Sequence, residues 1–178
     1  LQKAGCPVLV VSDSWKNLQQ SRLQGLPIHY GEILSESVDE SLELADMGYL
    51  LATTGNHAYN SLVCSVFIQH FGRNRVFQIA TNEKKMEKKQ LSGLFRGKVL
   101  FGGNLIYKEL ILQFIEGWRF QKTRLTEEFD LETLKDNNKG KLKPFIRIQS
   151  NGELDLDFFE DQTGAAPGDT IISFSKKT

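Results

Sequence analysis

The feature that most constrains this chain is a strand–helix–strand pattern near the start of the sequence. Pro7–Val11 is an aliphatic run without polar alternation, which is typical of a strand covered on both faces of a parallel sheet. Ser12–Ser14 offers several helix N-caps, a helix is predicted over Trp15–Gln24, and Gly25 stands where that helix would end. A second short strand is predicted over Leu26–Tyr30. Because β–α–β units are right-handed in nearly all sheets, this unit determines the handedness of the later strand connections.

The same alternation continues through the first half of the chain. It predicts a helix over 37–45 that starts from a capping box, a buried strand over Gly48–Thr54, a helix over Ala58–Phe71 and a strand over Arg75–Ala80. Strands that alternate with helices are typical of a parallel sheet covered by helices. We therefore predict an α/β fold with a doubly wound parallel sheet in this half.

A charged segment separates the two halves of the chain. The run EKKMEKK begins at Glu83, and its composition is typical of a solvated helix or linker. We place a linker at 83–96, between a parallel-sheet domain over 1–82 and a small α+β domain over 97–178. The elements predicted in the second half are a strand over 98–101, a helix from 104, a strand over 119–125, a helix starting at 126–128, a hairpin that joins 145–149 to 154–159 through Asn151-Gly152, and a last strand over 170–174.

Composition and motifs give no argument for catalysis. The 22 basic and 22 acidic residues balance, so no nucleic-acid partner is expected. Cys6 and Cys64 are too few for a disulfide framework or a metal knuckle, and they fit a reducing compartment. The sequence holds no Gly-x-Ser-x-Gly elbow, Walker loop or His-Glu-x-x-His motif. No apolar run approaches the roughly 18 residues of a membrane span, so we predict a soluble stretch without catalytic residues, metal site or enzymatic activity.

Polar residues follow three of the predicted strands, at the edge where α/β sheets bind ligands. The candidate binding residues at these strand ends are Ser12, Asp13, Gly31, Glu32, Thr54 and Asn56. For Asp13 and Asn56 the alternative is a helix cap or turn residue, a role worth about 1 kcal/mol. The sequence leaves both alternatives open.

Three stretches carry a resemblance to a known family: VLVVSDSWKNLQQSRLQGLPIHYGEILSES, LLATTGNHAYNSL and VFQIA. They resemble the Rossmann-like cytosolic domains called TrkA-N or RCK (regulator of conductance of potassium). In particular they are similar to those attached to bacterial sodium/proton antiporters. The resemblance covers about residues 1–82, and GLP-x-x-YG followed by an acid is its most telling part. The later LFRGKVLFGG, LTEEF and PGDTIISF are similar to the small α+β segment that follows in such antiporters.

The resemblance implies a regulatory, ligand-sensing domain of a monovalent cation:proton antiporter, at the cytoplasmic face of the inner membrane. It implies, as a partner, the transmembrane antiporter domain of the same parent chain. Because the central strand of the family's sheet is missing from this stretch, the centre of the sheet is unfilled, and we expect a homodimer. The six candidate residues would line a nucleotide pocket. The alternatives are a homodimerisation module of a transporter that binds no ligand, and a fragment of an NAD-dependent oxidoreductase.

Two departures from the family pattern affect the site. The family usually has an acid where this chain has Ser12, and Asp13 one residue later would face the other side of a strand. We therefore expect Glu32 to be the acid for a nucleotide and Asp13 to be chiefly a helix cap. The family's first strand and Gly-x-Gly-x-x-Gly loop would precede Leu1, so we expect no cofactor in this truncated stretch, and NAD(H) or an adenine nucleotide in the full-length parent.

Overall fold

The computed structural model describes residues 1–35, 47–81, 97–103, 105–138 and 141–176. The chain forms two compact units, Leu1–Leu50 and Leu51–Thr178, and each is described by itself. The predicted helix over 37–45 and the predicted linker over 83–96 lie outside the described residues. The predicted fold class is confirmed: parallel strand pairs with helices are followed by a smaller, antiparallel region.

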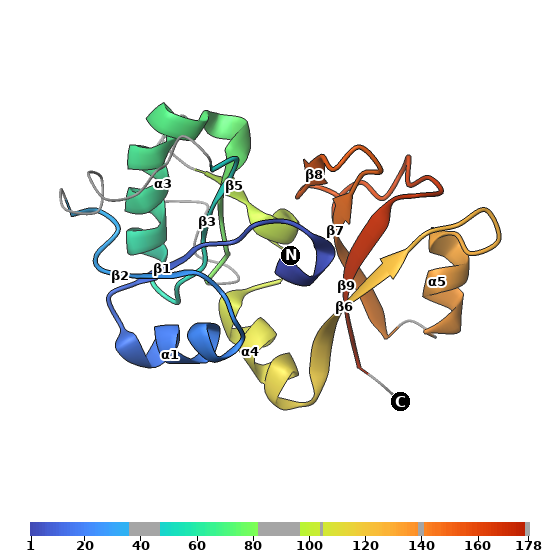
Figure 1. Cartoon of the computed structure of the whole chain (residues 1–178), viewed down its shortest axis with the longest axis horizontal. Helices are drawn as coiled ribbons and strands as arrows, with labels where there is room; N and C mark the ends of the chain where they lie inside the picture. The colour runs from blue at the N-terminus through green and yellow to red at the C-terminus, as the bar shows by residue number, and fades with distance from the viewer. Residues whose placement is uncertain (36–46, 82–96, 104, 139–140, 177–178) are drawn as a thin grey trace. The chain divides into compact units, whose positions relative to one another are not determined.

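Unit 1 is the strand–helix–strand pattern of the N-terminal sequence (Figure 1). Strands β1 and β2 are parallel, with Val10 opposite Ile28 and Ser12 opposite Tyr30. Helix α1 packs against both strands and buries Leu18 completely. Its elements are a 3₁₀ turn (Gln2–Ala4), β1 (Val10–Ser12), α1 (Trp15–Leu23) and β2 (Ile28–Tyr30).

The parallel part of unit 2 packs one long helix against a three-stranded sheet of order β3-β4-β5 (Figure 1). Helix α3 turns an apolar face toward β4, and Val63, Cys64 and Phe67 on that face are buried. The elements are β3 (Leu50–Ala52), α3 (His57–Phe71), a 3₁₀ turn (Arg73–Arg75), β4 (Val76–Gln78) and β5 (Lys98–Val99).

Strand β5 continues this sheet beyond the segment in which the sequence places the domain boundary. It runs parallel to β4, with Phe77 opposite Lys98. Gly97 makes the close approach possible, because a Cβ there would lie 2.7 Å from Cys64 Sγ and 2.9 Å from the Val76 carbonyl oxygen. The parallel sheet therefore includes residues that the sequence assigned to the second domain.

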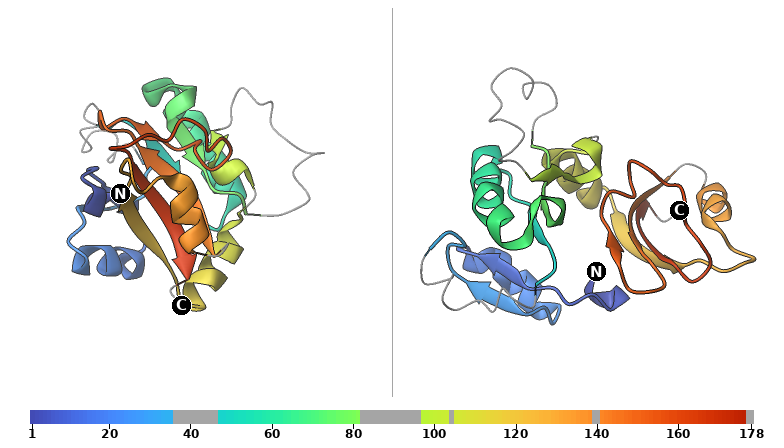
Figure 2. Two further views of the ribbon diagram at one scale, coloured as in Figure 1. Left: turned by 90° about the vertical axis from the view of Figure 1, so that its right-hand side faces the viewer. Right: turned by 90° about the horizontal axis from the view of Figure 1, so that it is seen from above.

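The rest of unit 2 is built on an antiparallel sheet of order β6-β9-β7-β8, with the last strand of the chain inside it (Figure 2). The predicted hairpin is confirmed, since β7 and β8 pair across Asn151-Gly152. The elements are a 3₁₀ segment (Leu100–Gly103), α4 (Tyr107–Ile115), β6 (Trp118–Arg124), α5 (Leu131–Asn137), β7 (Leu142–Ile148), β8 (Leu154–Asp155) and β9 (Thr170–Lys176).

One predicted helix start in this region is wrong. The sequence placed it at 126–128, but α5 begins at Leu131, and Asp130 is its N-cap. The Asp130 carboxylate accepts the Thr133 N–H at 2.8 Å. Thr126 instead closes a bend, because its hydroxyl accepts the Phe129 N–H at 3.1 Å.

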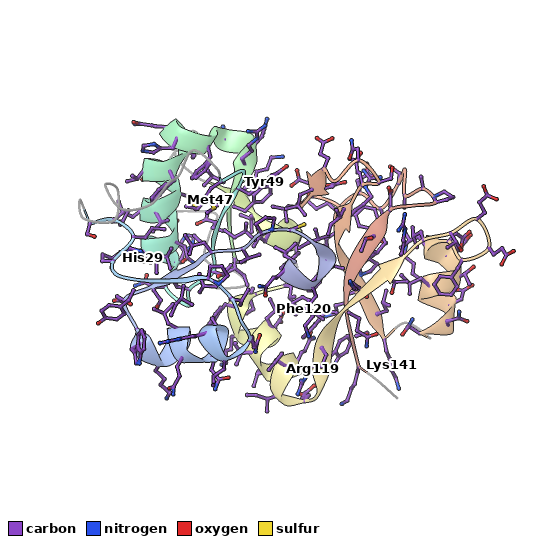
Figure 3. All side chains as sticks on the ribbon, in the orientation of Figure 1. His29, Met47, Tyr49, Arg119, Phe120 and Lys141 are labelled. Atoms are coloured by element: carbon purple, nitrogen blue, oxygen red, sulfur yellow. The ribbon has the colours of Figure 1, made fainter. Side chains whose placement is uncertain are left out.

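The two faces of the antiparallel sheet bury different kinds of side chain. On one face the rings of Phe120, marked in Figure 3, and Phe145 surround Phe174, with centroids 4.7 and 5.9 Å from it. The other face is covered by α5, whose Leu134 joins an aliphatic and aromatic cluster. This cluster consists of Leu125, Leu134, Phe158 and Ile171.

Candidate ligand site

In unit 1 the carboxyl ends of the two parallel strands bring Ser12 and Gly31 together. Ser12 is the last residue of β1, and its carbonyl oxygen accepts the Gly31 N–H at 3.0 Å. The Ser12 hydroxyl accepts the Ser14 N–H at 3.1 Å, at the start of α1. Two of the predicted site residues therefore meet at the edge where parallel sheets bind ligands.

The structure corrects the role of Asp13. The helix N-cap is Ser14, with φ −102° and ψ 108°, and helical geometry begins at Trp15. Asp13 thus lies one residue before the cap, and its side chain is exposed. The prediction that Asp13 caps the helix is wrong, because β1 continues to Ser12, one residue beyond the predicted strand, and Ser14 stands directly before the predicted first helical residue Trp15.

Glu32, the acid expected to contact a nucleotide, is half-buried and takes part in its own turn. Its Oε1 accepts the Leu34 N–H at 3.3 Å. Its carbonyl oxygen accepts the Ser35 hydroxyl at 2.7 Å. The first of these bonds holds the carboxylate beside the end of β2.

Two exposed aromatic residues flank the same edge and were missed from the sequence. Trp15 opens α1 and Tyr30 ends β2, and their rings meet edge-to-face with centroids 6.0 Å apart. Trp15 is 51% and Tyr30 61% exposed. The available signal was positional: one aromatic follows the helix cap and the other precedes Gly31.

In unit 2, Thr54 and Asn56 shape the loop between β3 and α3. Asn56 is the N-cap of α3, and its Oδ1 accepts the Tyr59 N–H at 3.1 Å. The Thr54 hydroxyl accepts the Asn56 N–H at 3.2 Å. The capping alternative for Asn56 is therefore confirmed, and both predicted residues sit together in this loop.

Asn60, which the sequence analysis missed, holds this loop closed. Its Oδ1 accepts both the Thr54 hydroxyl at 2.6 Å and the Thr54 N–H at 3.1 Å. Its Nδ2 donates to the Thr54 carbonyl oxygen at 2.9 Å. Asn60 is completely buried, on the same face of α3 as Val63, Cys64 and Phe67. A polar residue within that apolar stripe was the signal in the sequence.

Further polar atoms are buried around this end of unit 2. The Gln78 Oε1 accepts the Ser61 hydroxyl at 3.1 Å. The Gln78 Nε2, the His57 Nδ1 and the Thr81 Oγ1 are buried without a hydrogen-bond partner in the described part of the chain. A buried unsatisfied group costs about 1–3 kcal/mol, so these three groups are suited to meeting a polar partner.

The chemistry of these residues is that of recognition by hydrogen bonds. Burial raises the pKa of the Cys64 thiol to about 11, so this group is protonated and unreactive at neutral pH. Over the residues that the structure describes, no three His, Cys, Asp or Glu side chains gather closely enough to hold a metal ion. Over the same residues, no helix has the length and apolar character needed to cross a bilayer.

Parallel strands joined by helices, with polar groups at their carboxyl ends, define the Rossmann-like class of ligand-binding α/β domains. The chain belongs to the TrkA-N domain family, whose pattern its residues 1–95 match. TrkA-N domains are typically cytosolic regulatory domains of ion-transport proteins. No curated protein sequence matches the chain.

Among solved structures, the chain is similar to one titled "Crystal Structure of the GsuK RCK domain". The two are 13% identical, with a TM-score of 0.35, and the match covers 95% of this chain. It covers 43% of that chain, so the present chain spans less than half of its length.

Proposed function

We propose that this chain is the ligand-sensing regulatory module of a monovalent cation:proton antiporter, and that it is not itself a catalyst. The observation that carries the proposal is the TrkA-N match, which includes the adjoining strand ends at Ser12 and Gly31. The antiporter assignment is supported by the resemblance of the GLP-x-x-YG segment and of the C-terminal PGDTIISF to those transporters.

The proposed ligand is NAD(H) or an adenine nucleotide at the carboxyl edges of the parallel strands. In unit 1, Glu32 is the acid for the nucleotide, beside Ser12 and Gly31. In unit 2, Thr54 and Asn56 are the polar residues of the loop after β3, and they remain candidate binding residues of that unit by itself. The sequence holds no Gly-x-Gly-x-x-Gly loop, whose backbone amides bind phosphates in this fold. We therefore propose that a longer parent chain supplies that loop.

Regulation by such a module requires the ligand to bind two states of the transporter with different affinity. Isothermal titration with NAD and with ADP tests the ligand proposal. The chain as it stands should show weak or no heat of binding, and a longer chain carrying the phosphate loop should bind. Tight binding by the present chain would contradict the role given to the loop. If the longer chain showed no heat of binding, a module that binds no ligand would be favoured.

The proposed partner is a second copy of the chain, and one specific observation favours it. Helix α4 leaves four apolar side chains exposed: Ile111 (45%), Leu112 (49%), Phe114 (47%) and Ile115 (74%). Apolar side chains exposed together on one helix are suited to burial against a partner chain. Sedimentation analysis should show a dimer that Ile115→Glu dissociates. Leu23→Glu, at a 77% exposed leucine of α1, is the matched control and should leave the dimer intact.

A further inference from the structure

Gly55 lies in the loop between β3 and α3, and its backbone does not explain why it is a glycine. Its φ is outside the left-handed region, whereas Gly102 and Gly103 have φ of 60° and 72°. A Cβ at Gly55 would lie 3.2 Å from Cε1 and 3.4 Å from Cδ1 of Tyr107. The ring of Tyr107 therefore faces this glycine, and a methyl group there would fit only if the ring shifted by a few tenths of an ångström.

Tyr107 is the first residue of α4, and that helix is anchored at both ends. At its start the Tyr107 N–H donates to the Ala80 carbonyl oxygen at 2.7 Å, beyond the end of β4. At its end the Arg119 guanidinium of β6 donates to the Phe114 carbonyl oxygen at 2.7 Å and lies over the Phe114 ring. A displacement of the first turn of α4 thus has a direct path to the antiparallel sheet.

We propose that the Gly55–Tyr107 contact couples the β3–α3 loop to α4 and, through α4, to the antiparallel sheet. A movement of Gly55 toward the ring by more than the small space between them must move the first turn of α4, because packed groups cannot overlap. Tyr107 is a positioning residue in this inference. The inference rests on the proposed function only for its use of the loop as the place where a ligand acts.

The coupling can be measured without any ligand. Thr54→Val keeps the shape of the side chain but removes the hydroxyl that bonds Asn60 and Asn56, so it frees the loop that carries Gly55 to move against Tyr107. Hydrogen exchange at the Leu110 and Glu116 amides of α4 is the readout, with Ile172 in β9 as the reference for global opening. In this variant, exchange in α4 should become about fivefold faster relative to exchange at Ile172. This factor is expected if the free energy lost with one hydrogen bond in the loop is transmitted to α4.

The same measurement in two further backgrounds identifies the path. In Tyr107→Ala the effect of Thr54→Val on α4 should disappear, although the backbone bond to Ala80 remains. In Tyr107→Phe, which keeps the ring, the effect should persist. An unchanged α4 in the wild-type background, equal acceleration at the reference, or an equal effect in Tyr107→Ala would each overturn the proposal.

A second readout keeps the proposal testable if Thr54→Val does not fold. Gly55→Ala should lower the melting temperature, and the same change in the Tyr107→Ala background should cost nothing. An equal loss in both backgrounds would show that the ring is not what requires glycine. Because neither experiment uses a nucleotide, a failed NAD titration leaves the coupling intact, and failed coupling leaves the ligand proposal intact.

Discussion

Arg147 and Asp155 form an ion pair between directly opposed residues of β7 and β8. Their Nη2 and Oδ2 atoms are 2.9 Å apart, and the side chains are 15% and 24% exposed. The Arg147 Nη1 also donates to the Gly164 carbonyl oxygen at 2.6 Å. One side chain therefore holds the hairpin and the long β8–β9 connection together.

We expect Arg147→Met to destabilise the protein by about 2 kcal/mol, below the 3–5 kcal/mol of a fully buried pair because both groups are partly hydrated. The change leaves the Asp155 carboxylate unpaired and releases the Gly164 carbonyl oxygen. Urea denaturation measures this loss of unfolding free energy. Arg147→Met in an Asp155→Leu background is the comparison, and it should cost clearly less. An equal cost in both backgrounds would show that the ion pair contributes nothing.

Asn56→Ala should lower the free energy of unfolding by about 1 kcal/mol, because it removes the side-chain cap of α3. Asp13→Ala, at an exposed residue outside the helix, should change it by less than about 0.5 kcal/mol. Thermal denaturation of the two variants side by side is the measurement. If Asp13→Ala proved the more damaging change, the assignment of Ser14 as the cap would be incorrect.

Asp130 makes the stability of the α5 region depend on pH. Hydrogen bonds from Thr133 lower the pKa of the Asp130 carboxyl below its ordinary value of 3.8. The unfolded chain thus binds this proton more tightly, so the contribution is fully present above pH 4 and is lost as the pH falls through the lowered pKa. Asp130→Asn should remove this part of the dependence of stability on acid pH. The measurement is the free energy of unfolding at intervals of about one pH unit between pH 2 and 6. If the unfolding free energy of the wild-type protein and of Asp130→Asn depended on pH in the same way, this prediction would be contradicted.

Gly97→Ala should destabilise unit 2 by about 1–3 kcal/mol, because its Cβ would overlap Cys64 Sγ and the Val76 carbonyl oxygen. Cys64→Ala should recover part of the loss, since only the contact with the sulfur is relieved. The control is Gly48→Ala, where a Cβ would meet no atom of the described chain within 4 Å. Equal effects of the two glycine changes in a chemical denaturation series would refute the close approach of β5.

Much of the local structure follows from the sequence alone, because its signals are local. The aliphatic run before Ser12, the helix stop at Gly25 and the Asn151-Gly152 turn each act on neighbouring residues, and the elements they predict are present. The same holds for Asn56, whose capping bond spans only three residues. The start of α1 at Trp15 also follows from the sequence, whereas the bend before α5 moves that helix start from 126–128 to Leu131.

The tertiary structure alone decided which distant residues meet. The pairing of β5 with β4 depends on how close Gly97 can come to Cys64, and this distance has no counterpart in the local pattern. The contact of Gly55 with Tyr107 likewise joins residues far apart in the chain. Propensity and periodicity describe a residue and its near neighbours, whereas packing is decided by the space that the assembled elements leave between them.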